Sequence, residues 1–283
     1  MKKRIRTLLI VLGVFVGIVL VPVLVAQLSH QEPAPRPAIR LDGLTYEEIR
    51  FENPAGGIGL AGMMFVPAGS PPFPAVVIIH GSGTSSRENS WYLTYATYLQ
   101  RNGIAVLLPD KRGSGASAGD WRKSSLEDLA TDTEAAISYL STERPGLASS
   151  VGVLGVSQGG MIAPIVAARS PDLAFAIDVV GGTIPMHDLL RYEEQHNLAQ
   201  MGFLPGVSHG LAYATSAVNR WVVSRDFWSA IGNFDPMTYW RNVDVPALVL
   251  FGDQDTNVPS GRSRDRLNAL SRSSHRGLLP PKG

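Results

Sequence analysis

Short apolar runs separated by helix-length segments constrain the fold of this 283-residue chain more than any other feature. Each run is bounded by turn-forming residues and is apolar on both faces, as strands buried on two sides are. The segment 124–141 between two runs has a serine cap, an acidic first turn and apolar residues at helical spacing. This alternation predicts an α/β fold, with a mostly parallel sheet and helices on both faces. The predicted strands are residues 75–80, 104–110, 151–155, 174–180 and 246–252.

Two segments before this series predict an antiparallel hairpin. Residues 45–52 and 58–66 alternate as strands do, and they flank the turn-forming sequence NPAGG at 53–57. Further helices are predicted at about 91–101 and 160–169.

Residues 183–240 interrupt the alternation with 58 residues that contain no buried-strand signal. A structureless loop of that length is implausible in a compact domain, so we expect a helical insertion over the sheet. The insertion holds nine of the 22 aromatic residues. They either line a substrate pocket or pack the insertion's own core.

The N-terminus has the pattern of an export segment. Basic residues at 2–6 precede an apolar run at 8–26, whose roughly 19 residues would span about 28 Å as a helix. The segment is either a cleaved signal peptide, whose helix Pro22 would break, or an uncleaved membrane anchor. The anchor is favoured, because signal cleavage prefers a small residue at the position that Leu24 occupies. The charge asymmetry sends the rest of the chain outward, to a secreted, periplasmic or anchored location. Residues 27–40 contain three prolines and predict an extended spacer.

Composition excludes several classes of protein. With 45% hydrophobic and 17% charged residues, the chain can bury a sizeable core. The net charge is +1, but the basic N-terminus and residues 260–283 contribute +4 and +5, which leaves −8 on the part between them. An acidic body argues against a nucleic-acid partner. The absence of cysteine excludes disulfides, thiolate metal sites and a cysteine nucleophile.

Metal and phosphate motifs are also missing from the sequence. There is no HExxH, and the six histidines do not cluster with carboxylates at ligand spacing. The segment DKRGSG at 110–115 resembles an anion site, but a turn closed by an Asp–Arg pair is the favoured interpretation. We therefore expect no metal and no phosphate ligand.

The sequence GVSQGG at 155–160 follows a predicted strand and opens a predicted helix. A serine on so tight a turn needs neighbouring glycines, because its backbone is strained and crowded, and the turn presents Oγ at the helix N-terminus. The pattern alone is weak, since GVSHG at 206–210 repeats it around Ser208. Ser208 follows no strand, so Ser157 is the candidate nucleophile.

The sequence HGSG at 80–83 directly follows another strand. Acyl transfer places negative charge on the carbonyl oxygen, and a glycine-rich loop lets backbone N–H groups approach that oxygen. The amides of Ser82 and Gln158 are the candidate oxyanion donors. For His80 we expect a structural role, in which the imidazole orders the loop by hydrogen bonding.

A third candidate residue follows the strand at 246–252. In the sequence GDQDTNVP, Asp255 is placed to orient an imidazole and stabilise its charged form, with Asp253 as the alternative. Capping of the following helix is the competing interpretation for either carboxylate.

These motifs, each at a strand end, resemble the α/β-hydrolase superfamily. LAGMMFVP at 60–67 is similar to the entry region of its dienelactone-hydrolase-like and serine-peptidase-like branches. The likeness spans about residues 45–270, within a domain at 41–271, and implies the order serine then aspartate. It also implies that residues 183–240 form a lid over the substrate pocket and that no cofactor is used.

The resemblance further implies a last strand and a loop carrying a catalytic histidine, which the sequence lacks. A helix predicted at 259–271 ends roughly 20 Å from the site, and the four residues to His275 span at most about 14 Å. His275 can serve as the base only if that helix is much shorter. Residues 272–283 predict a basic irregular tail. For the other histidines outside HGSG we expect solvation or local bonding; they are His30, His187, His196 and His209.

One explanation is a hydrolase truncated or frame-shifted before its last strand. Genomic resequencing across the 3′ end tests this, and an intact frame without a downstream homologous stretch counts against it. The favoured function is an exported serine hydrolase that cleaves small-molecule carboxylic esters through an acyl-enzyme. The alternatives are a peptidase or other amide hydrolase, and a non-catalytic binding protein that lacks the base.

Overall fold

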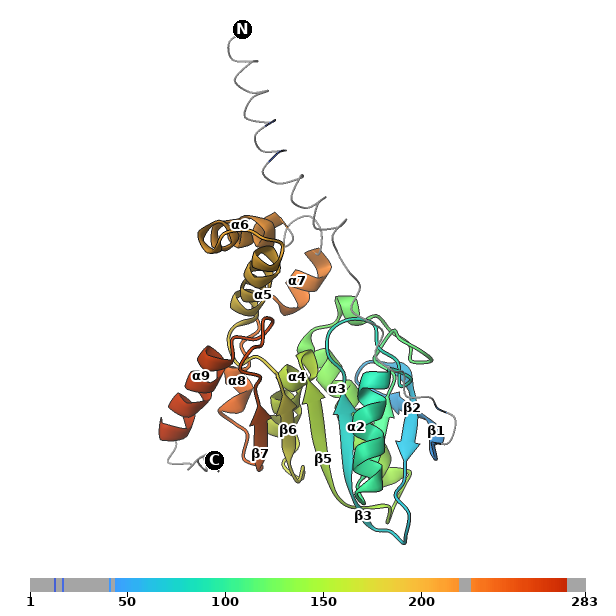
Figure 1. Cartoon of the computed structure of the whole chain (residues 1–283). Helices are drawn as coiled ribbons and strands as arrows, with labels where there is room; N and C mark the ends of the chain where they lie inside the picture. Colours follow the sequence, from blue (N-terminus) through green and yellow to red (C-terminus); the bar gives the residue numbers. More distant parts are fainter. Residues whose placement is uncertain (1–12, 14–16, 18–40, 42–43, 219–224, 274–283) are drawn as a thin grey trace, which may run out of the picture.

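A seven-stranded sheet forms the centre of the described part of this computed structural model, which comprises residues 13, 17, 41, 44–218 and 225–273 (Figure 1). The strand order is β1-β2-β4-β3-β5-β6-β7. The strands are β1 (Glu47–Asn53), β2 (Ile58–Phe65), β3 (Phe73–Ile79), β4 (Ala105–Pro109), β5 (Ala148–Val156), β6 (Ala176–Val179) and β7 (Ala247–Leu250).

The sheet is antiparallel at one edge and parallel elsewhere. β1 pairs antiparallel with β2, and β2 pairs antiparallel with β4. The five strands from β4 to β7 in the sheet order pair in parallel. The predicted hairpin, the predicted strands and the mostly parallel sheet are therefore confirmed, with small differences at the strand ends.

Helices follow the strands as the alternation predicts. The segment predicted at 124–141 has the expected capping box, in which Ser125 and Asp128 each accept the other's backbone N–H. The helices are α2 (Ser90–Arg101), the 3-10 turn η1 (Trp121–Lys123), α3 (Leu126–Thr142), α4 (Gln158–Arg169), α5 (Met186–Gln200), α6 (Pro205–Val218), α7 (Arg225–Ile231), α8 (Met237–Trp240) and α9 (Ser260–Ser273).

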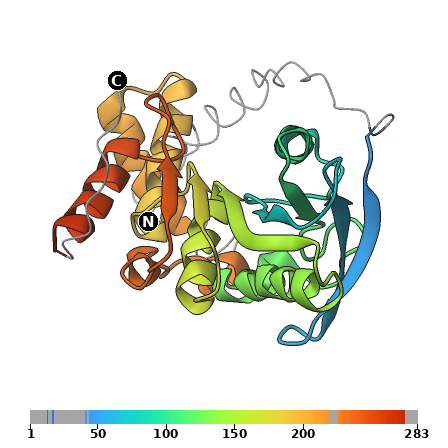
Figure 2. The same cartoon turned by 90° about the horizontal axis from the view of Figure 1, so that it is seen from below.

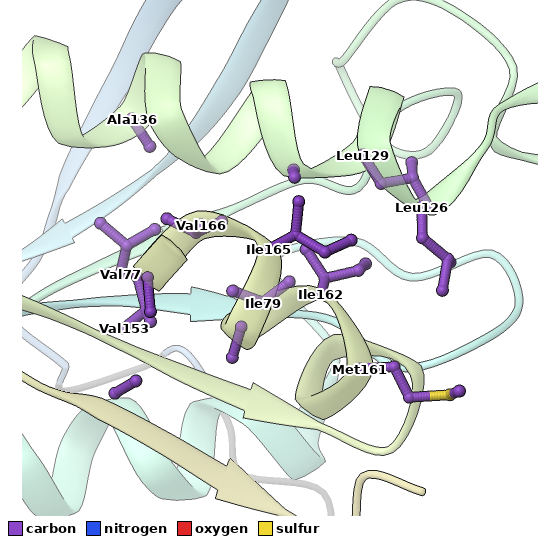
Figure 3. Close-up of a cluster of buried hydrophobic side chains, with 14 of the residues drawn as sticks. Val77, Ile79, Leu126, Leu129, Ala136, Val153, Met161, Ile162, Ile165 and Val166 are labelled. Atoms are coloured by element: carbon purple, nitrogen blue, oxygen red, sulfur yellow. The ribbon is translucent and has the colours of Figure 1, made fainter. Parts of the chain in front are cut away.

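Both faces of the sheet are buried at its central strands, which explains why these strands are apolar on both sides, whereas the edge strands β1 and β7 are partly exposed. Alternate residues of β3 enter two separate hydrophobic clusters. Val76 and Ile78 belong to the cluster that includes residues of α2, whereas Val77 and Ile79 belong to the cluster that includes residues of α3 and α4. The helices lie on both faces of the sheet (Figure 2). Figure 3 shows the second cluster, where Ile162 and other apolar side chains of α4 fill the space between the sheet and α3.

The insertion after β6 is helical. Helices α5, α6 and α7 lie beyond the edge at which the parallel strands end (Figure 1). Two aromatic residues of the segment, Phe234 and Trp240, join the main core, and α8 packs against α4. These two aromatics therefore line neither a pocket nor a separate core of the insertion.

The predicted export segment at 8–26 lies outside the described residues apart from Gly13 and Gly17. Within the described ranges, no helix combines the length and the apolar character needed to cross a membrane. The membrane anchor, the signal peptide and the spacer at 27–40 stay predictions.

Candidate active site

Ser157 occupies the turn between β5 and α4 in a conformation that few residues adopt. Its backbone has φ 55° and ψ −116°, and its N–H donates to Val179 O at 2.9 Å. Such a backbone costs about 1–3 kcal/mol and persists only where its surroundings hold it. A Cβ on Gly155 would overlap the carbonyl of Gly159, and one on Gly159 would overlap the carbonyl of Ile79. Both glycines are therefore required by the close approach of backbone to backbone.

The loop after β3 lies directly beside Ser157. A Cβ placed on Gly81 would lie 3.4 Å from the Cβ of Ser157. Gln158 is the first residue of α4, so its N–H has no acceptor within the helix. The loop that carries Ser82 and the N-terminus that carries Gln158 thus meet at the serine. Their role as oxyanion donors stays a prediction.

His80 has the structural role expected of it. The imidazole is buried, its Nε2–H donates to Pro109 O at 2.6 Å, and its Nδ1 accepts from Ser85 Oγ at 2.8 Å. Burial, with a smaller contribution from Lys111, lowers the pKa of His80 to about 4. His80 is therefore neutral at physiological pH and ties the loop to the end of β4.

Asp255 lies in the loop between β7 and α9. Its Oδ1 accepts from the N–H groups of Asn257 and Val258 at 2.8 and 2.9 Å. Its carbonyl accepts from Tyr192 Oη at 3.1 Å, which connects the loop to α5. Asp255 is partly buried, whereas the alternative Asp253 is exposed. The carboxylate therefore shapes its own turn, and a role in orienting an imidazole stays a prediction.

The remaining described histidines make local contacts, as expected. His196 Nδ1–H donates to Tyr192 O at 2.8 Å, His209 Nδ1 lies 3.2 Å from Gln195 Oε1, and His187 lies 3.4 Å from the Asp188 carboxylate. The described part of the chain thus shows no histidine bonded to the candidate serine or aspartate.

The condition set for His275 is not met, because α9 continues to Ser273 rather than ending early. His275 itself, like His30, lies outside the described residues.

The second GxSxG copy has a different environment from the first. Ser208 is buried inside α6, where its Oγ donates to Pro205 O at 3.0 Å. Ser208 follows helix α5 rather than a strand, as the sequence predicted.

The turn at 110–115 forms, but its charged pairs differ from the expected ones. Asp110 Oδ2 accepts from the Ala116 N–H at 2.8 Å and Oδ1 from the Arg87 N–H at 2.6 Å. Arg112 instead makes a bidentate pair with Asp132 on α3, at 2.9 and 2.8 Å. The expectation of an Asp–Arg pair closing this turn was wrong, because the partner of Arg112 comes from a helix distant in sequence.

Comparison with known proteins agrees with this arrangement. The family described as serine aminopeptidase, S33, matches residues 70–221, which are more than half of the chain. The chain belongs to this family. It thus belongs to the α/β-hydrolase superfamily, as the strand-end motifs predict.

Relatives of this S33 family member include both esterases and peptidases. Esterase EstD of Thermotoga maritima is 25% identical over 226 residues, covering 75% of this chain and 54% of EstD. The acylamino-acid-releasing enzyme of Homo sapiens is 25% identical over 262 residues, covering 89% of this chain and 32% of the enzyme. The chain therefore spans about half of the first relative and about a third of the second.

Solved structures show the same fold. The Pyrococcus furiosus esterase Pf2001 aligns with a TM-score of 0.63 at 16% identity, covering 86% of both chains. The α/β hydrolase GrgF from Penicillium sp. sh18 aligns with a TM-score of 0.60 at 19% identity, covering 80% of this chain and 86% of GrgF.

Two buried charged residues near the site were missed in the sequence. Lys111 is 7% exposed, and burial lowers its pKa to about 7. Asp178 in β6 is 1% exposed, and burial raises its pKa to about 7, although its Oδ1 accepts from the Gly181 N–H at 2.7 Å. The only signal for Asp178 was a carboxylate inside the apolar run 174–180, and for Lys111 a cation directly after a strand.

Proposed function

We propose that this chain is an exported serine hydrolase that cleaves carboxylic esters through Ser157. The observation that carries the proposal is the strained serine at the β5–α4 turn, placed against the loop that begins at His80. Strain of this kind at a strand end fits a residue selected for exposure of its hydroxyl rather than for packing.

The proposed reaction follows from these positions. Ser157 Oγ attacks the acyl carbon, and its proton passes to an imidazole and then to the leaving alcohol. The Ser82 and Gln158 N–H groups stabilise the oxyanion, each contributing about 3 kcal/mol in comparable enzymes. Water then hydrolyses the acyl-enzyme and restores the serine. Asp255 would orient the imidazole, which is the one component that the described residues do not supply.

An ester substrate is favoured over an amide by two of the similar proteins, EstD and Pf2001, which are named as esterases. The peptidase alternative is supported by the family description and by the acylamino-acid-releasing enzymes. A panel of p-nitrophenyl acyl esters and aminoacyl anilides, compared by kcat/KM, separates the two. A higher kcat/KM for the anilides would reject the ester proposal and keep the serine mechanism.

Labelling with a fluorophosphonate tests the nucleophile itself. We expect the parent chain and a Ser208→Ala control to be labelled, because the second motif copy lies inside α6. Ser157→Ala should abolish both labelling and ester turnover. If the parent is not labelled and turns over no faster than Ser157→Ala, the chain is a non-catalytic binding protein.

Export is proposed from the basic residues 2–6 and the apolar run 8–26. Cell fractionation and N-terminal sequencing test this part separately. The chain should leave the cytoplasm, and deletion of residues 2–26 should retain it there. An intact N-terminus in the membrane fraction would identify an anchor, and a new N-terminus near residue 27 would identify a cleaved signal peptide.

A further inference from the structure

We propose that Lys111 is a positioning residue that holds the two candidate oxyanion donors in place. Its ammonium binds the carbonyl of Gly81 and the side chain of Gln158, and so fixes the segments that carry the Ser82 and Gln158 N–H groups. This inference rests on the proposed serine hydrolase function.

The contact with Gly81 controls the direction of the Ser82 N–H. Lys111 Nζ donates to Gly81 O at 2.6 Å. That carbonyl and the Ser82 N–H belong to one planar peptide unit, in which a trans bond points them in opposite directions. Holding the oxygen on the lysine side therefore turns the N–H to the other side. Without this contact the unit can flip, because glycine at position 81 allows a wide range of backbone angles.

The same ammonium reaches the second donor residue. Lys111 Nζ donates to Gln158 Oε1 at 2.7 Å, and the Gln158 side chain is 6% exposed. The first residue of α4 is thereby joined through one cation to the loop after β3. The Gly81 N–H donates to Tyr92 Oη at 2.6 Å, so the glycine is held on both of its polar groups.

The charge of Lys111 adds to this positioning. A hydrogen bond from a cation polarises the peptide unit and makes its N–H a stronger donor. The ammonium also lies 4.8 Å from the centre of the Trp121 ring, which forms a T-shaped pair with the Phe227 ring of α7. Trp121 thus connects the lysine to the helical insertion.

Two titratable groups beside Lys111, His80 and Tyr92, keep their charge states across neutral pH. His80, with a pKa of about 4, is neutral, and burial raises the pKa of Tyr92, so its phenol stays neutral. The Arg122 guanidinium lies over the same Trp121 ring, and the Asp110 carboxylate accepts from two backbone N–H groups and lies 3.6 Å from the Arg87 guanidinium. Lys111, with a pKa lowered by burial to about 7, changes charge near neutrality, unlike His80 and Tyr92.

Lys111→Met tests the inference, since methionine removes the charge and the donor but keeps an unbranched side chain. Lys123→Met, in the exposed part of η1, is the matched control. With p-nitrophenyl butyrate we expect Lys111→Met to lower kcat about 10- to 100-fold with little change in KM, as loss of oxyanion stabilisation does. Lys123→Met should match the parent.

The pH profile separates positioning from a merely structural role. In the parent, kcat/KM should fall as pH rises through about 7, because Lys111 loses its proton, and this fall should be missing in Lys111→Met. Lys111→Gln, which keeps a neutral donor, should retain an intermediate kcat and also lack the fall. Thermal unfolding of each variant identifies any loss of fold, and Lys111→Gln carries the test if Lys111→Met does not fold.

The outcomes distinguish the two proposals. If the parent is not labelled at Ser157, the proposed function fails and this inference falls with it. If the parent is labelled and active but Lys111→Met keeps the parent's kcat and pH profile, only the inference is overturned. A loss confined to KM would also overturn it.

Discussion

Replacing Asp178 with asparagine should stabilise the protein, and the gain should depend on pH. The carboxyl is 1% exposed, and burial raises its pKa from the usual 3.8 to about 7. Between these two pH values the unfolded chain releases a proton that the folded chain keeps, so stability falls by about 1.4 kcal/mol per pH unit. The full cost, reached above pH 7, is about 4 kcal/mol at most. Asparagine cannot ionise, and its oxygen can still accept from the Gly181 N–H.

Urea unfolding at pH 4, 6 and 8 measures this effect. We expect Asp178→Asn to differ least from the parent at pH 4, which lies close to the pKa of the unfolded carboxyl and well below that of the folded one. The midpoint of the variant should exceed that of the parent at pH 6 and by the largest margin at pH 8. An equal difference at every pH, or a less stable variant at pH 8, would refute the reasoning from burial.

Three further substitutions probe the packing that supports the site. Gly159→Ala should destabilise the protein by about 3 kcal/mol or more, because its Cβ would overlap the backbone of β3. Gly261→Ala in α9 should stabilise the protein by about 0.5–1 kcal/mol, because its Cβ would meet nothing within 4 Å. Urea unfolding of the two variants measures both effects. Arg112→Met should cost about 3–5 kcal/mol by leaving the Asp132 carboxylate without its cationic partner, with the Asn53 amide still donating to it. Adding Asp132→Leu should recover part of the loss in a double-mutant cycle. Ser125→Ala should lower the thermal midpoint by removing the capping box of α3, a loss of about 1 kcal/mol, and an unchanged midpoint would contradict this.

The sequence alone determined the elements of this fold and the position of the candidate serine. Strands covered on both faces require continuous apolar runs, and helices require apolar residues at their own spacing, so both patterns are visible along the chain. The turn at Ser157 was also visible, because glycine is the residue that fits where backbones approach closely. These are local properties, and neighbouring residues suffice to express them.

Only the tertiary structure decided which charged groups meet. Arg112 pairs with Asp132 on α3, and Lys111 reaches both Gly81 and Gln158, which are far from it in sequence. The sheet order, in which β3 lies between β4 and β5, brings these segments to one edge. No local pattern encodes that order, because it follows from how the strands and helices bury one another. Burial also set the pKa values of Lys111 and Asp178, since both shifts arise from loss of water rather than from any neighbour in the sequence.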